Sequence, residues 1–248
     1  MALTASPQDQ ARLLDLQGLD TRLRQLEHKA STLPEHKEIE RLAAQGVELR
    51  SRLSTATGAW EDNQSEIRRL ESDVEIVETR AQRDRDRLQT SSSVKDVQAL
   101  EAELVSLAKR RSDLEDIELG LMEVAEGLRA DLDAVQIEHN GLQGAIAAAE
   151  QARDTALAGL RAEQEQVAGE RERLAASLPD DLVALYEKQR ARYGYGASLL
   201  RARVSSASGV ALTESDLAGI RKAAPDAVLL CPESQAILVR TEIGRAHV

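Results

Sequence analysis

Apolar side chains recur along most of this chain with a spacing that alternates between three and four residues. One such series begins at Leu49 and a second begins at Val97. The first continues through Leu53, Ala56, Trp60, Asn63, Ile67, Leu70, Val74, Val77, Ala81, Asp84 and Leu88, and the second through Leu100, Leu104, Leu107, Arg111, Leu114, Glu118, Leu121 and onward to Leu174. A mean spacing of about 3.5 residues keeps one narrow apolar stripe against a partner helix, which is typical of a coiled coil. We therefore predict a mainly α-helical chain whose long helices pair.

The composition is that of a helix pair and not of a large globular core. The 248 residues include no Phe, one Trp and three Tyr, so the aromatic side chains that usually fill such a core are missing. A pair of helices has almost no concave interior in which to build an active site. The sequence also has no Gly-rich phosphate loop, nucleophile elbow or His/carboxylate cluster with metal spacing. We expect a spacer, scaffold or adaptor and not an enzyme.

Charge and cysteine content exclude several further classes. A formal net charge of -11 argues against a chain that coats nucleic acid or an anionic membrane along its whole length. The single Cys cannot form an internal disulfide, and the sequence opens without a secretory h-region. No apolar run approaches the roughly 20 residues needed to span a bilayer. We expect a cytoplasmic protein with no membrane partner.

Two nearly equal helical arms predict the topology. Pro34 interrupts the first arm, and the polar stretch 90–93 separates the arms, with Ser93 placed to cap the second. From Gln8 to Leu88 there are 81 residues, and from Val94 to Ser177 there are 84. Matched arms predict an antiparallel hairpin over residues 7–178 with its turn at about 89–93. The alternative is a parallel dimer in which the serines are only an irregularity.

A different pattern follows the hairpin. Pro179 ends the long helix, and residues 179–196 are expected to form a short helix and a Gly-containing linker. Beyond it, β-branched runs at 228–230 and 237–239 flank a turn that contains Cys231. These runs predict a small hairpin of strands within a module at residues 197–241.

Three short stretches carry a family resemblance. They are 13–17 (Leu-Leu-Asp-Leu-Gln) through Pro34, then 94–101 (Val-Lys-Asp-Val-Gln-Ala-Leu-Glu), and 185–187 (Leu-Tyr-Glu). In this order and spacing the chain resembles bacterial proteins that have a CT398-like coiled-coil hairpin followed by a C4-type zinc ribbon. The resemblance implies a long antiparallel coiled-coil hairpin with a small zinc-ribbon-like β module. It also implies nucleic-acid binding, although some relatives look like export chaperones or adaptors.

The ribbon departs from the pattern of the family it resembles. Two Cys-x-x-Cys pairs would supply four thiolates to a tetrahedral zinc, but the matching positions are Ser205, Ser208, Cys231 and Ser234. A serine hydroxyl stays protonated near neutral pH and is a poor zinc ligand. We expect the zinc of the family to be lost and the chain to carry no cofactor. Glu233 should raise the pKa of Cys231, which argues against a second interpretation of this residue as a redox thiol.

One segment of this acidic chain is basic. No acidic residue lies between Glu187 and Glu214, and two tyrosines are interleaved with the cations. The candidate residues are Lys188, Arg190, Arg192, Tyr193, Tyr195, Arg201 and Arg203. Cations can contact phosphates while tyrosines stack on bases, so the segment indicates single-stranded nucleic acid as a partner. The alternative is that these arginines pair with nearby carboxylates such as Glu170, Glu172, Asp180 and Asp181.

Two expectations concern the rest of the chain. A long hairpin can hold a protein partner along its flank, so an adaptor or chaperone-like scaffold is the alternative function, by analogy of fold. Residues 243–248 resemble the translation of a sequencing adapter, and we interpret them as a non-native tail.

Overall fold

The computed structural model describes residues 3–240, so the tail predicted at 243–248 lies outside the described residues. The elements are α1 (Pro7–Ser31), α2 (Pro34–Thr90), α3 (Val94–Ala176), α4 (Asp180–Tyr193), β1 (Ala197–Arg201), β2 (Val204–Ser205), α5 (Glu214–Lys222) and β3 (Ile237–Arg240). Contacts divide the chain into two units. The hairpin unit is Glu35–Ala152, and the terminal unit combines the chain up to Pro34 with the chain from Arg153 onward.

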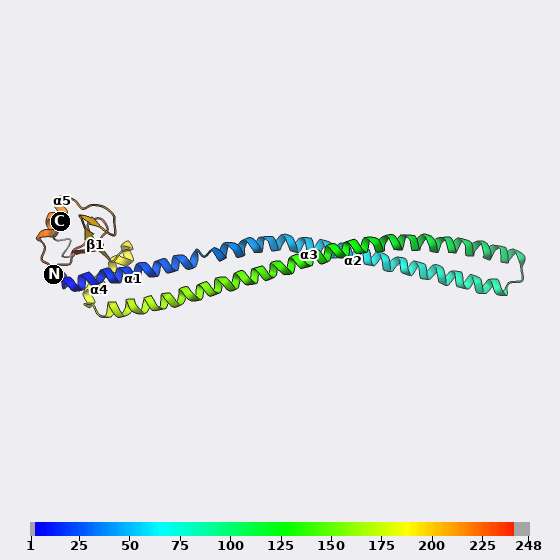
Figure 1. Cartoon of the computed structure of the whole chain (residues 1–248), viewed down its shortest axis with the longest axis horizontal. Coiled ribbons are helices and arrows are strands. Elements are labelled where there is room, and N and C mark those ends of the chain that lie inside the picture. The colour runs from blue at the N-terminus through cyan, green and yellow to red at the C-terminus, as the bar shows by residue number, and fades with distance from the viewer. Residues whose placement is uncertain (1–2, 241–248) are drawn as a thin grey trace. The chain divides into compact units, whose positions relative to one another are not determined.

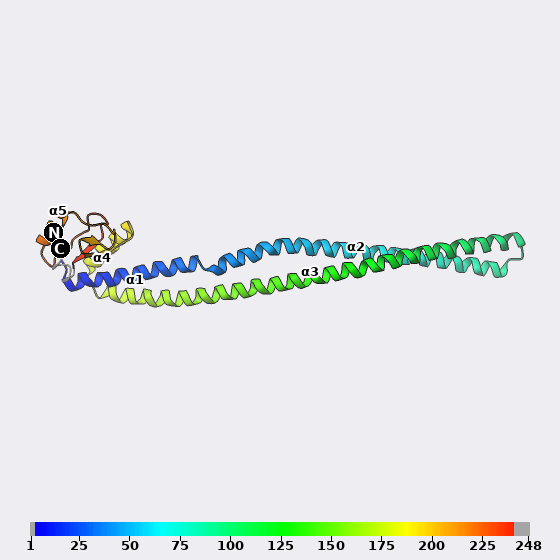
Figure 2. The ribbon, with the colours of Figure 1, turned by 45° about the horizontal axis from the view of Figure 1, so that its top comes forward.

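In the hairpin unit, α2 and α3 run antiparallel. Figure 1 shows them side by side, and they remain so in the second view of Figure 2. Arg52 pairs with Glu138 at 2.9 Å, while Glu78, farther along α2, pairs with Arg111 at 3.2 Å. Partners thus approach the turn from both sides, as they must within one folded-back chain. The predicted coiled-coil hairpin is confirmed.

The ends of the long helices follow local rules. The turn between α2 and α3 is residues 91–93, and the Ser93 hydroxyl accepts a hydrogen bond from the Asp96 N–H at 3.4 Å. This bond satisfies one of the N–H groups that an opening helix turn leaves unpaired. At the other break, the Thr32 N–H donates to the His28 carbonyl at 3.0 Å, and α2 begins at Pro34 itself. Proline suits this first helical position because it has no N–H to satisfy.

The seam of the hairpin unit is mostly apolar, with Asn63 and Asp84 as buried polar residues. Its buried apolar residues include Leu42, Leu49, Ala81, Leu107, Leu114 and Val135. Asn63 is also buried, and its Nδ2 donates to the Leu121 carbonyl at 3.3 Å. The Nδ2 group of an asparagine in the seam meets such a carbonyl only in one alignment of the two helices, while Oδ1 of Asn63 is buried without a partner among the described residues. It therefore favours one register at some cost in stability.

In the terminal unit, β3 lies between two apolar clusters. Side chains of successive strand residues point to opposite faces. Ile237 and Val239 accordingly join the cluster of Leu13, Leu16, Leu178, Leu182, Tyr186 and Ala197. Leu238 joins the second cluster, which holds Leu200, Leu212, Leu217, Ile220 and Cys231. The first cluster packs the strand onto α1 and α4, so the small sheet shares its core with the helices beside it (Figure 1).

The sheet differs from the predicted hairpin of strands. Its order is β2-β1-β3, with β1 antiparallel to β2 and parallel to β3. The predicted strand at 228–230 is reduced to one antiparallel bridge, Leu230↔Ile237, and a hydrogen bond from the Leu238 N–H to the Leu229 carbonyl at 2.8 Å, so the predicted pairing is present only in this short form. β1 takes the place beside β3 although it is Ala-Ser-Leu-Leu-Arg, with no β-branched residue. Burial of Ala197 and Leu200 outweighs the weak strand propensity of this segment.

The antiparallel pairing is testable by crosslinking. An added Cβ at Gly46 would lie 3.7 Å from Leu142 Cδ2. In a Cys231→Ala background, we expect Gly46→Cys with Leu142→Cys to crosslink within one chain when treated with a short bismaleimide. Val47→Cys with Leu142→Cys is the matched control, because Val47 is 62% exposed and lies outside the seam, so the pair should crosslink much less. Denaturing electrophoresis would contradict the hairpin if the Gly46 pair gave only covalent dimers.

Candidate functional site

The beginning of β1 is held by a buried glutamine on α1. Gln17 Oε1 accepts hydrogen bonds from the backbone N–H groups of Gly196, at 2.8 Å, and Ala197, at 3.3 Å. Gly196 packs so closely on Tyr186 that a Cβ there would clash with carbons of the aromatic ring. Only glycine therefore fits at this position. The contact fixes where the candidate segment leaves α4 and enters the sheet.

The Tyr186 hydroxyl completes this junction. It donates to Asp20 Oδ2 at 2.6 Å, and Asp20 is only 3% exposed. Burial, and then the hydrogen bond to Asp20, raise the pKa of Tyr186 well above its usual value. Because the folded pKa lies above the unfolded one, the hydroxyl stabilises the fold fully below about pH 10. That contribution is lost as the pH rises from there through the folded pKa.

An ion-pair network surrounds the same aspartate. Arg171 Nε lies 2.7 Å from Asp20 Oδ1, and the guanidinium also pairs with Glu187. Burial by itself lowers the pKa of Arg171, but hydrogen bonds to both carboxylates raise it overall, so the cation stays charged. Arg190 pairs with Glu187 at 2.8 Å and lies 3.5 Å from Asp20. One predicted nucleic-acid contact, Arg190, is therefore part of the internal network.

A second predicted contact is also paired with a carboxylate. Arg203 forms an ion pair with Glu214, on α5. The sequence had suggested Glu170, Glu172, Asp180 and Asp181 as partners for the basic segment. The observed partners of Arg190 and Arg203 are instead Asp20, Glu187 and Glu214. The carboxylate-pairing alternative thus applies to two of the seven candidates, with different acidic residues.

The other five candidates lie on the surface. Lys188, Arg192, Tyr193, Tyr195 and Arg201 are exposed. The Arg192 guanidinium lies 5.2 Å from the centre of the Tyr193 ring. Tyr195 is approached in the same way by Arg24 of α1, at 5.1 Å. Such contacts hold each cation over an aromatic face.

Arg24 belongs to a shallow groove that sequence reasoning missed. The groove has a volume of about 420 Å³ and is lined by Tyr195 together with Thr21, Arg24, Gln25, His28 and Lys29 of α1. We name it the Tyr195 groove. Three of its residues can carry positive charge, yet they lie some 170 positions from Tyr195 in the chain. The signal in the sequence was the group of basic residues at 22–29, which lies within the predicted hairpin and far from the basic segment after Glu187.

Three of the four expected ligand positions of the ribbon meet in the core. Ser205 and Cys231 are fully buried, and the hydroxyls of Ser205 and Ser234 lie within hydrogen-bonding reach of the Cys231 sulfur. Ser208 lies apart from this contact, and its Oγ accepts from the Val210 N–H at 3.3 Å. One thiol and three hydroxyls do not fit zinc, which binds thiolate, imidazole or carboxylate. Within residues 3–240 there is also no group of three or more His, Cys, Asp or Glu that could hold a metal.

The environment of Cys231 corrects one expectation. Burial raises the pKa of its thiol, but hydrogen bonds from the Ser234 side chain and backbone and from Ser205 outweigh burial and lower it. Glu233 contributes a backbone N–H that also lowers the pKa. The expected increase caused by the Glu233 carboxylate was therefore wrong, because in this turn the residue acts through its amide.

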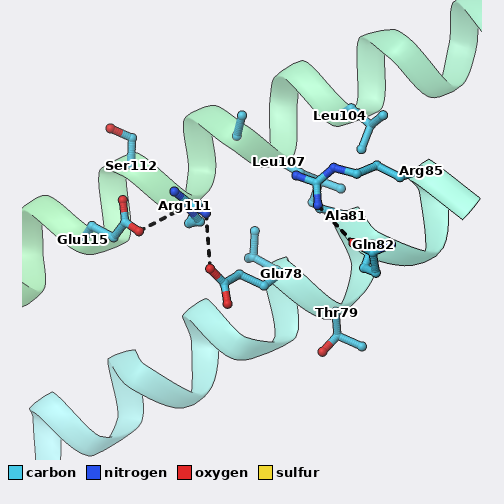
Figure 3. Close-up of a pocket in the computed structure, with 12 residues that line it drawn as sticks. Glu78, Thr79, Ala81, Gln82, Arg85, Leu104, Leu107, Arg111, Ser112 and Glu115 are labelled. Carbon is cyan, nitrogen blue, oxygen red and sulfur yellow. Dashed lines mark hydrogen bonds and ion pairs between the residues drawn. The ribbon is translucent and has the colours of Figure 1, made fainter.

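The hairpin unit carries a separate hollow. Between α2 and α3 lies a notch of about 700 Å³ whose floor includes Val77, Ala81, Leu104 and Leu107. Figure 3 shows Arg111 between Glu78 and Glu115, to which it is bound at 3.2 and 3.1 Å. Arg85 and Gln82 line the notch as well. We call it the α2–α3 notch. Ala81 is too small to fill the seam opposite Leu107, so a hollow with a polar rim remains.

These features define a coiled-coil hairpin protein with a small three-stranded sheet toward its C-terminal end. The chain belongs to the family of the CT398-like coiled coil hairpin domain, whose model matches residues 16–194. In the described part of the chain, the helices are too polar or too short for any of them to cross a membrane.

Relatives cover nearly the whole chain. The uncharacterised protein Rv2229c of Mycobacterium tuberculosis is 35% identical over 241 residues, which are 97% of this chain and 98% of the relative. A solved structure from Mycobacterium smegmatis is 36% identical with a TM-score of 0.87, and the match covers 96% of this chain and 100% of that one. CT398 from Chlamydia trachomatis is 18% identical with a TM-score of 0.63, covering 94% and 98%. At that identity the likeness to CT398 concerns the fold alone.

The junction at Tyr186 yields a stability prediction. Tyr186→Phe removes the donor to the buried Asp20 carboxylate, and a hydrogen bond to a charged group contributes roughly 1.5–3 kcal/mol. We expect faster hydrogen exchange at the amides of Gly196 and Ala197, because the junction that holds them opens more often. Tyr193→Phe is the matched control, since Tyr193 is 41% exposed. Equal exchange at these amides in the wild type and in Tyr186→Phe would contradict the junction's role.

Proposed function

We propose that this chain is a non-enzymatic protein that binds single-stranded nucleic acid through its terminal unit. The observation that carries the proposal is the Tyr195 groove, in which an exposed tyrosine lies beside cations of α1. Aromatic faces accept any base by stacking, while cations beside them contact the phosphates. Tyr193 and Arg192 provide a second pair of the same kind two residues earlier.

The balance of charge supports this location. The chain as a whole has a formal charge of -11, so a polyanion would be repelled by most of its surface. Around Tyr195 the exposed cations come from two elements, Arg24 and Lys29 of α1 and Arg192 of α4. The cations of this surface would therefore attract a phosphate backbone. Arg190 and Arg203 are not part of the proposed contact surface, because carboxylates already hold them.

Salt dependence gives a quantitative test. Lys29→Ala with Arg192→Ala removes two expected phosphate contacts, and each contact contributes about 0.7 to the salt slope for a single strand. We expect weaker binding of a fluorescent oligo(dT) and a slope lower by roughly 1.4, measured by anisotropy over a salt series. Tyr195→Ala should weaken binding by about 1–3 kcal/mol with little change in slope, because stacking releases no counterions.

The matched control changes the same charge elsewhere. Lys37→Ala with Arg50→Ala removes two exposed cations of the hairpin unit, and we expect the slope of the wild type. Arg203→Ala should likewise bind normally, since Arg203 pairs with Glu214. The proposal fails if the wild type does not bind oligo(dT) at low salt, or if both double variants lose affinity equally.

The α2–α3 notch favours a second candidate function, that of an adaptor which holds a protein partner along the hairpin. Its apolar floor and its Arg and Glu rim are suited to one side chain or one helix turn of a partner. Such a contact would survive salt better than a phosphate contact, because burial of apolar surface is not screened.

Site-specific photocrosslinking distinguishes this alternative. A benzoylphenylalanine at Ala108, on the notch, should crosslink one defined protein in nuclease-treated host extract at high salt. The same group at Ala130, an exposed position of α3 outside the notch, is the control. Identical crosslinks from both positions, or none from Ala108, would exclude the notch as a docking site.

A further inference from the structure

Two turns of the C-terminal module, 205–210 and 231–236, have the same backbone hydrogen bonds. In each turn the first residue donates its N–H to the carbonyl five residues later, at 3.3 Å from Ser205 and 2.8 Å from Cys231. Its own carbonyl accepts from the N–H four residues later, at 2.9 Å in both turns. This fifth residue of the turn has positive φ in both, 68° at Gly209 and 58° at Gln235.

The side chains of the two turns are placed alike as well. The N–H of the sixth residue donates to the hydroxyl of the fourth, at 3.3 Å to Ser208 and 3.4 Å to Ser234. In the second turn, the N–H groups of Glu233 and Ser234 also point at the Cys231 sulfur. Backbone N–H groups aimed at the first and fourth side chains stabilise negative charge there. Neutral hydroxyls do not need that arrangement, whereas metal-bound thiolates do.

The first and fourth positions have the spacing of a metal knuckle. Structural zinc sites take their thiolates from two turns with two residues between the ligands. Here the two turns face each other, because the hydroxyl of Ser205 in the first turn lies against the Cys231 sulfur of the second. Ser205 is tied in addition to Ser198 of β1, with 3.1 Å between the two hydroxyl oxygens. The backbone of a four-ligand site is therefore present, with only one ligand of the right chemistry.

We propose that hydrogen bonds among Ser205, Cys231 and Ser234 occupy the place of a metal ion in this module. A hydroxyl can donate and accept at once, and a thiol sulfur can accept, so two hydroxyls and one thiol can satisfy one another where a zinc would have satisfied four thiolates. The proposal does not depend on nucleic-acid binding. It explains why two dissimilar sequences, Ser-Ser-Ala-Ser-Gly-Val and Cys-Pro-Glu-Ser-Gln-Ala, adopt one turn geometry.

Stability without a metal has a visible source. Small modules usually need a metal or disulfide because their own core is too small. In this module β3 is buried on both faces, by Leu13 and Leu16 of α1 on one side and by Leu217 of α5 on the other. Gln17 fixes the first strand in addition. Residues of the helices beside it therefore complete the core of the module.

Restoring the thiols tests the proposal on the full chain. We expect the wild type to hold no stoichiometric zinc and to melt at the same temperature with and without chelator. Ser205→Cys, Ser208→Cys and Ser234→Cys together should bind one zinc ion, and Co²⁺ should give the visible absorption of a tetrahedral four-thiolate site. Chelator should then lower the melting temperature of this variant, because metal binding contributes to its folding.

The control adds the same number of thiols at exposed serines, as Ser51→Cys, Ser92→Cys and Ser112→Cys, and should give no such Co²⁺ spectrum. Stoichiometric zinc in the wild type would overturn the proposal. The proposal would also be overturned if the variant with all three Ser→Cys changes in the turns took up no Co²⁺, whether its far-ultraviolet circular dichroism shows it folded or not.

A second variant tests the hydrogen bonds without any metal. Ser205→Ala removes the hydroxyl that contacts Cys231, so the thiol should titrate at higher pH in absorbance at 240 nm and the module should melt earlier. Ser215→Ala, at an exposed position of α5, should change neither. An unchanged thiol titration in Ser205→Ala would show that the three side chains are merely adjacent.

Discussion

The hydrogen bonds that Gln17 and Asp20 of α1 accept are the constraint on which the terminal unit depends. One side chain accepts from the first amides of the sheet, and the other accepts from Tyr186 of α4. Both are buried, so each would be costly if its partner were lost. Arg171 compensates the buried charge of Asp20 from α3. Three helices and the sheet are thereby tied at one place, and this is what brings Tyr195 beside α1.

The same constraint explains why the candidate site could only partly be predicted. The basic segment and its tyrosines were visible as composition, and six of the seven residues are exposed. The sequence could not show that Asp20 takes part in holding Arg190, because the two lie far apart in the chain and neither belongs to a motif. For the same reason Arg24 and Lys29 were not among the predicted contacts. Proximity created by tertiary packing leaves no local pattern.

The hairpin was predictable for the opposite reason. Its stabilising contacts repeat every three or four residues, so the seam can be identified from one helix alone. Pro34 and the serines at 91–93 mark its interruptions through local backbone chemistry. The small sheet lacks such repetition. β1 has poor strand propensity and is placed by Gln17 and by burial between two clusters, so the runs of β-branched residues at 228–230 and 237–239 indicated the short antiparallel contact between them but not the pairing of β3 with β1.

Packing against α1 also decides what the turns around Cys231 need in order to persist. In a free-standing ribbon, four metal bonds hold two turns together, and replacing three thiolates by hydroxyls would remove most of that free energy. Here Gln17 fixes Gly196, the residue before β1. Ser198 of β1 then contacts Ser205 of the first turn. The contacts with the helices thus restrain the backbone around the turns independently of any contact within the turns. Hydrogen bonds among three small side chains then have only to satisfy buried polar groups, which is a much weaker requirement than holding the fold together.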